Sequence, residues 1–119
     1  MSNINESLQQ LLELDGAKAA SLVDSESGMV LGEAGSGLDM ELAAAGNSQV
    51  VKAKLDTIKN LELNEELVDI MITLDSQYHL IRPIKSQKGL FFYLVLDISK
   101  SNLALARRKV QNVETALEV

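Results

Sequence analysis

The chain has no cysteine and only one histidine among its 119 residues. The absence of cysteine excludes disulfides and thiolate metal sites and leaves no thiol redox chemistry. A lone histidine without cysteine cannot complete a zinc site of the usual kind. Basic residues are also few, 11 against 17 acidic ones, and the resulting net charge of −6 disfavours nucleic acid as a partner.

Long apolar runs are missing too. No segment approaches the roughly 20 apolar residues that a membrane-spanning helix needs, so we expect no direct membrane insertion. The opening residues MSNINESLQQ have neither the basic nor the apolar stretch of a secretory signal, and we expect a cytoplasmic protein. The composition, 46% hydrophobic and 24% charged, is that of a globular protein, and the length predicts one domain, residues 1–119.

The most informative stretch is residues 38–61, which predict a long amphipathic helix with Asp39 as its N-cap. A helix that docks once onto a core needs a single apolar stripe. This one has two: Leu42, Gly46, Val50, Ala53 and Leu61 on one side, and Ala44, Val51, Leu55 and Ile58 on the other. Two interpretations are open, a helix well buried within its own chain or a helix shared with a partner.

The other elements follow from periodicity and turn residues. We expect helices from Asn3 or Asn5 to residue 14 and from Ser99 or Ser101 to the C-terminus, and strands at 17–23, 29–31, 66–74, 78–84 and 90–96. Glycines in residues 32–37 would form a hinge. Pro83 should lie at a strand end or at an unpaired position, because it cannot donate a ladder hydrogen bond. Strand 90–96 is apolar on both faces and should be central.

In strand 66–74, alternation places Val68, Ile70 and Ile72 on one face. The short loops make consecutive strands antiparallel. The predicted fold class is therefore α+β, a five-stranded antiparallel sheet flanked by helices in the order helix, two strands, helix, three strands, helix.

Three segments carry a resemblance to a known family: GAKAASLVDSESGMVLG at 16–32, LVLD at 94–97 and NLALARR at 102–108. In this order and spacing the chain resembles the roadblock/dynein-light-chain family over nearly its whole length, in a stand-alone bacterial or archaeal form. The resemblance implies a single profilin-like domain with strand order 2-1-5-4-3, the two terminal helices on one face and the long central helix on the other.

The resemblance also implies a homodimer in which third strands pair and second helices pack together. The residues that it would place in the dimer interface are Leu42, Ala45, Gly46, Val50, Ala53, Val68, Ile70 and Ile72. Bacterial relatives include the gliding-motility partner of a Ras-like GTPase. The function implied is therefore regulation or scaffolding of a small Ras-like GTPase.

The sequence gives no sign of catalytic, cofactor or metal residues, and we expect a non-enzymatic protein without a cofactor. His79 is interpreted as structural, and the carboxylates as solvated charges. Residues 32–37 lack the Gly-Lys-Ser/Thr of a nucleotide-binding P-loop. The basic residues Lys100, Arg107, Arg108 and Lys109 form either the solvated face of the last helix or a docking site for an acidic partner.

Polar residues between the two stripes of the long helix, Gln49, Lys52 and Asp56, are candidates for contact with the GTPase. The proposed mechanism is preferential binding of one nucleotide state. Two alternatives remain: a structural subunit of a larger complex without GTPase dependence, and a small-molecule sensor domain. Four aromatic residues leave little to line a cofactor pocket, which counts against the sensor.

Overall fold

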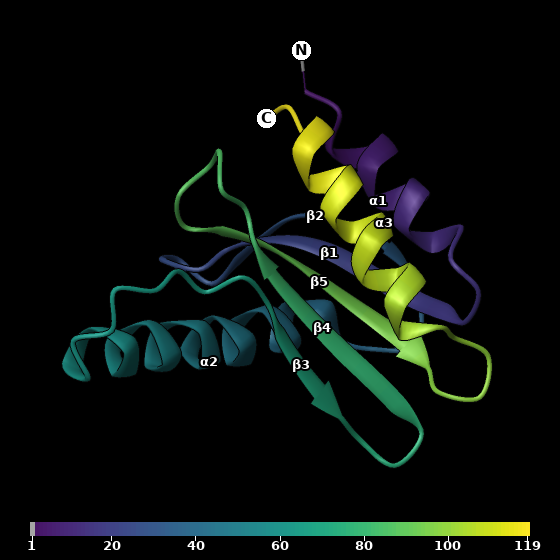
Figure 1. Ribbon diagram of the computed structural model, residues 1–119. Helices are drawn as coiled ribbons and strands as arrows, with labels where there is room; N and C mark the ends of the chain where they lie inside the picture. The colour runs from purple at the N-terminus through teal and green to yellow at the C-terminus, as the bar shows by residue number, and fades with distance from the viewer. Residues whose placement is uncertain (1) are drawn as a thin grey trace.

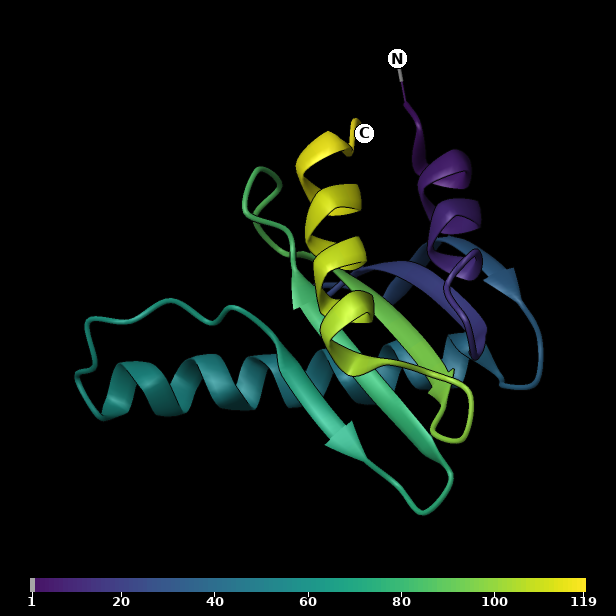
Figure 2. The same ribbon diagram turned by 45° about the vertical axis from the view of Figure 1, so that its right-hand side comes forward.

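The computed structural model describes residues 2–119. Along the chain the elements are α1 (Ile4–Leu12), β1 (Ala17–Asp24), β2 (Met29–Gly35), α2 (Met40–Asn60), β3 (Ile70–Thr73), β4 (Gln77–Pro83), β5 (Leu90–Asp97) and α3 (Leu103–Ala116). The strands form an antiparallel sheet in the order β2-β1-β5-β4-β3. Helices α1 and α3 lie side by side on one face and α2 lies on the other (Figures 1 and 2). The predicted fold class and strand order are confirmed.

Two apolar cores lie on the two faces of the sheet, and β5 serves both. Phe92, Leu94 and Leu96 pack beneath α1 and α3, whereas Phe91, Tyr93 and Val95 pack beneath α2. All six are at most 1% exposed. Because successive side chains of a strand point to opposite faces, a strand covered on both sides must be apolar throughout. The prediction that residues 90–96 form the central strand is confirmed.

Helix α2 begins as the sequence predicts, with Asp39 Oδ1 accepting a hydrogen bond from the Leu42 amide at 3.1 Å. Its buried residues, Met40, Ala44, Ser48 and Val51, all lie between its first residue and the position just past its midpoint. Figure 1 shows the C-terminal half continuing past the edge of the sheet. The 21 residues of the helix span about 31 Å at 1.5 Å per residue, more than the sheet beneath covers.

The hinge expected at residues 32–37 is wrong for its first half, because β2 runs on to Gly35, which pairs with Ala19. Gly35 has φ +86°, and a Cβ there would lie 2.2 Å from the Lys18 carbonyl oxygen. At Gly32 a Cβ would lie 2.8 Å from Ile4 of α1. These glycines therefore permit close approach of neighbouring backbone and helix rather than flexibility.

The third strand is shorter than the predicted 66–74, since it begins at Ile70. In the observed register Ile70 faces Ile81 on β4, so continuing the ladder would bring Val68 opposite Pro83. Proline has no amide hydrogen to donate, and the pairing stops before it. Pro83 is the last residue of β4, as predicted.

The caps of the terminal helices differ from the prediction. Asn102, rather than Ser99 or Ser101, caps α3 by accepting from the Leu105 amide at 3.1 Å. The Ser99 hydroxyl donates instead to Asp97 at 2.7 Å. Asn3 precedes α1, but its side chain joins the two ends of the chain, donating to Ala116 O and accepting from the Glu118 amide.

Candidate functional site

The outer stripe of α2 faces solvent. Leu42 is 71% exposed, Val50 38% and Leu61 63%, and Ala45, Gly46 and Ala53 are exposed as well. Nothing within residues 2–119 covers this stripe. The interpretation of α2 as a helix buried on all sides by its own chain is therefore wrong.

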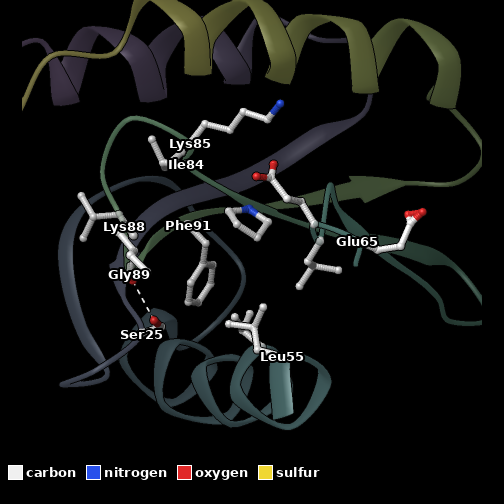
Figure 3. A pocket seen from close by; sticks show the side chains of 13 residues that line it. Ser25, Leu55, Glu65, Ile84, Lys85, Lys88, Gly89 and Phe91 are labelled. Atoms are coloured by element: carbon white, nitrogen blue, oxygen red, sulfur yellow. Dashed lines mark hydrogen bonds between the residues drawn. The ribbon is translucent and has the colours of Figure 1, made fainter. Parts of the chain in front are cut away.

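The inner stripe of α2 packs against the sheet only over its first half. Ala44 and Val51 are buried, whereas Leu55 is 46% exposed because the helix has passed the sheet at that point. Leu55 instead forms one wall of a pocket of about 460 Å³ between α2 and the β4–β5 hairpin. Figure 3 shows Leu55 and Phe91 facing this space, with the Ser25 hydroxyl donating to Gly89 O at 2.7 Å beside it.

The pocket in Figure 3 does not have the enclosed form that a sensor domain needs. Its apolar floor is bordered by charged side chains of both signs, Lys85, Lys88, Glu65 and Glu66. All four are exposed. The space is therefore an open surface depression with charges of both signs.

Among residues 2–119 no strand lies beside the outer edge of β3, because there β3 pairs with β4 alone. Ile70 and Ile72 are partly buried on the side of α2. Val68, 50% exposed, instead borders a cleft beside α3. The prediction that these three residues share a face is wrong for Val68, because it lies outside the strand and the two-residue alternation does not reach it.

A groove of about 530 Å³ joins the outer stripe of α2 to the β3 edge. Val50 and Ala53 form its helical wall, and Leu67 and Ile70 form the opposite wall. Leu42 and Gly46 lie further toward the N-terminus of α2, beside a second cleft that includes His79 and Tyr93. Most of the candidate interface residues are thus brought together on one side of the molecule. Val68 lies apart from them, at the cleft beside α3.

The three polar candidates for partner contact, Gln49, Lys52 and Asp56, are all exposed on α2. Lys52 is also used within the chain, since its ammonium donates to the Glu26 carbonyl oxygen at 3.3 Å. Gln49 and Asp56 have no hydrogen-bond partner among the described residues.

His79 is held by both ring nitrogens. Nδ1 is 2.9 Å from the Tyr93 hydroxyl and Nε2 is 2.9 Å from Gln77 Oε1, and the Tyr93 ring meets the imidazole edge-on. Burial lowers the pKa of His79 and raises that of Tyr93, against a smaller opposite effect of the Asn47 side chain. Burial therefore favours the neutral form of His79, and its structural role stays a prediction. Among residues 2–119 no group of three acidic or histidine side chains could hold a metal ion, and no helix is long and apolar enough to cross a membrane.

The basic residues of the last helix are partly neutralised. Arg107 donates two hydrogen bonds to Asp69, at 2.9 and 3.2 Å, and Lys109 lies 3.5 Å from Glu13. Arg108 is exposed and has no such partner in the part of the chain that the structure describes. Neither interpretation of this cluster is complete: Arg107 and Lys109 are in intramolecular ion pairs, whereas Lys100 and Arg108 are in none among the described residues.

The sequence missed a buried ion pair between Arg82 and Glu114. Arg82 Nε donates to Glu114 Oε1 at 2.7 Å, and the Lys85 amide donates to Oε2 at 3.0 Å. The two side chains are only 10% and 7% exposed, so the interpretation of the carboxylates as solvated is wrong for Glu114. Its spacing was the available signal, because Glu114 follows the buried Val110 by four residues on the same helical face.

Comparisons with known proteins agree on the fold. No protein-family profile and no curated protein matches the sequence. Among solved structures, Myxococcus xanthus MglB has 20% identity and a TM-score of 0.82 over 94% of this chain and 89% of that chain. The roadblock/LC7 domain of Streptomyces avermitilis has 14% identity and a TM-score of 0.83 over 97% and 94%. An MglB structure with a tetrameric arrangement has 18% identity and a TM-score of 0.81 over 96% and 84%. The chain therefore has the fold of roadblock/LC7 domains, as its sequence resemblance implied.

Proposed function

We propose that the protein is a non-catalytic homodimeric interaction module that binds and regulates a small Ras-like GTPase. The observation that carries this proposal is the outer stripe of α2, an exposed apolar surface that continues through a groove to the unpaired edge of β3. Exposed apolar surface of this extent, rimmed by polar residues, marks a protein-binding site more often than an ordinary solvated face.

The same surface suits a second copy of the chain. Two β3 edges related by a two-fold axis would pair as antiparallel strands and join the two sheets, which removes an exposed edge. Two α2 helices would then lie next to each other. A Cβ at Gly46 would have no neighbour within 4 Å in the single chain, so this glycine leaves room for a second helix to approach. A structural relative with a tetrameric arrangement supports self-association of this fold.

The proposal that the partner is a Ras-like GTPase rests on the family resemblance and on the similarity to MglB structures. In the dimer, Gln49 and Asp56 would remain beside the packed helices and form a polar platform. A platform that binds one nucleotide state more tightly shifts the GTPase toward that state by the ratio of its two affinities, without contributing a catalytic group.

The test is affinity capture from native extract, run in parallel with GDP and with a non-hydrolysable GTP analogue. Recovery of a small GTPase under only one of the two conditions is expected. Recovery of the same protein under both would favour a scaffold, and recovery of no GTPase would refute the proposal. Gln49→Arg with Asp56→Lys should abolish capture, whereas Glu62→Lys, an exposed charge reversal just after α2, serves as the matched control.

The dimer is tested separately by the mass of the purified protein in solution. We expect twice the 12.9 kDa of the chain. Val50→Glu should give a folded monomer, because it places a charge in the middle of the outer stripe. A wild-type monomer at high concentration would refute the dimer.

A further inference from the structure

The cleft that Val68 borders lies beside α3 and the end of β4, and α3 covers the face of the sheet opposite α2 (Figure 1). Its volume is about 450 Å³, and its lining includes three arginines, Arg82, Arg107 and Arg108, with Gln111 beside them. Val68 and Ala104 supply its apolar wall. Three guanidinium groups around one depression are unusual in a chain of net charge −6.

Arg82 presents free donors to this cleft from a fixed position. Its Nε donates to Glu114 at 2.7 Å, and its two terminal nitrogens donate no hydrogen bond to a described residue. These nitrogens are not among the fully buried unpaired atoms of the described chain, so the small exposed part of this 90%-buried side chain includes them. The buried Glu114 pair therefore orients a guanidinium edge toward solvent.

The other two arginines differ in how they are held. Arg107 is turned by its two hydrogen bonds to Asp69, which precedes β3. Arg108 is exposed and has no partner in residues 2–119. One arginine is thus fixed by a carboxylate that is 7% exposed and one by a carboxylate that is 11% exposed, whereas the third is free to move onto a ligand.

The local charge selects the ligand. Three guanidinium groups carry three positive charges, and the carboxylates of Glu114 and Asp69 neutralise two of them. The remaining positive charge is balanced by one carboxylate of a ligand, whereas a phosphate dianion would leave an excess of negative charge. The apolar wall next to the guanidinium groups suits the methylene groups of a glutamate side chain. We propose that this cleft binds a glutamate or aspartate side chain on an acidic segment of a partner protein. The site is on the α3 face and does not rest on the GTPase proposal.

The test uses two labelled peptides, Gly-Ser-Glu-Leu-Glu-Ser-Gly and its Gln counterpart, titrated into the full chain and followed by NMR of the arginine Nε–H groups. We expect the acidic peptide alone to bind and to shift the Arg82 resonance. Arg108→Gln should weaken binding about tenfold, the loss expected for one hydrogen bond between charged groups. Lys100→Gln removes the same charge from an exposed position outside the cleft and should leave binding unchanged.

Four outcomes would overturn the proposal. Equal binding of the Gln peptide would show that the cleft does not recognise a carboxylate. If Lys100→Gln weakened binding as much as Arg108→Gln, the peptide would be attracted only by the overall positive charge. Tighter binding of a phosphoserine version of the peptide would contradict the charge argument. A change of oligomeric state in Arg108→Gln would show that the cleft is a contact between copies of this chain, since Val68 borders both this cleft and the proposed dimer interface.

Discussion

Replacing Glu114 by Gln should cost a large part of the stability of this protein. The carboxylate accepts one hydrogen bond from Arg82 Nε and one from the Lys85 amide, so it ties β4 and the following turn to the last turn of α3. Glutamine has the same shape but only one acceptor oxygen. Whichever way the amide turns, one of the two donors loses its partner, and the Arg82 charge stays buried without a counter-charge.

The expected cost follows from burial. Removing one member of a buried ion pair costs about 3–5 kcal/mol, whereas an exposed pair contributes at most about 1 kcal/mol. Arg82 and Glu114 are 10% and 7% exposed, which places them in the first class. A domain of this size has a free energy of unfolding of about 5–15 kcal/mol. Glu114→Gln should therefore lower the melting temperature by more than about 10 °C.

The assay is urea unfolding of a double-mutant cycle made of Arg82→Met, Glu114→Gln and the two together. Arg82→Met leaves an unpaired buried carboxylate, just as Glu114→Gln leaves an unpaired buried guanidinium group. The losses of unfolding free energy in the two single variants should therefore add up to more than the loss in the double variant. We expect a coupling free energy of about 2 kcal/mol or more. Lys109→Gln breaks the Lys109–Glu13 pair, in which the two side chains are 34% and 69% exposed, and is the control that should cost under about 1 kcal/mol. Additivity of the two buried changes within about 0.5 kcal/mol would refute the reasoning.

Three further predictions concern stability. Gly35→Ala should lower the free energy of unfolding in urea by more than about 3 kcal/mol, because the added Cβ would lie 2.2 Å from the Lys18 carbonyl oxygen. The control Gly37→Ala is also at positive φ but in open space, so it should cost only the roughly 1–2 kcal/mol of a left-handed residue. Equal costs would contradict the steric argument. Asp39→Ala should cost about 1 kcal/mol through loss of the N-cap of α2, and Asp39→Asn should restore most of it. Burial lowers the pKa of His79 from 6.5, so the unfolded chain binds a proton more readily than the folded one, and the stability that neutral His79 contributes is lost as pH falls through 6.5. His79→Asn should therefore make the free energy of unfolding less dependent on pH between about pH 7.5 and 5.5. An unchanged slope of this free energy against pH would contradict the argument.

The order of the elements could be predicted because it depends on local patterns. The continuous apolar run of β5, helical spacing in α3 and the cap at Asp39 are each contained in a few neighbouring residues. Features that depend on distant residues could not be predicted. Val68 falls outside β3 because of the position of Pro83 in the neighbouring strand, and Gly35 is required by the carbonyl of Lys18. Register decides both, and the sequence alone did not supply it.

The candidate site was predicted in the same uneven way. The outer stripe of α2 is a local pattern, and its exposure in the structure agrees with the expectation of a shared helix. The arginine cleft joins residues from β4 and α3, and its orienting carboxylate Glu114 is 32 positions from Arg82. No short motif connects them. Only Arg107 and Arg108 were visible as a basic cluster, and the structure shows that one of these is already paired.

Helix α2 is the place where the local sequence and the single chain disagree. Capping and helical spacing agree with the observed fold, yet Leu42, Val50 and Leu61 are exposed and Gly46 lies in mid-helix without a packing reason in the single chain. Glycine there costs about 1 kcal/mol relative to alanine. Exceptions of this kind in an otherwise consistent sequence are typical of functional surfaces. A second helix packed at Gly46 would account for the apolar stripe and the glycine together, whereas a solvated helix accounts for neither.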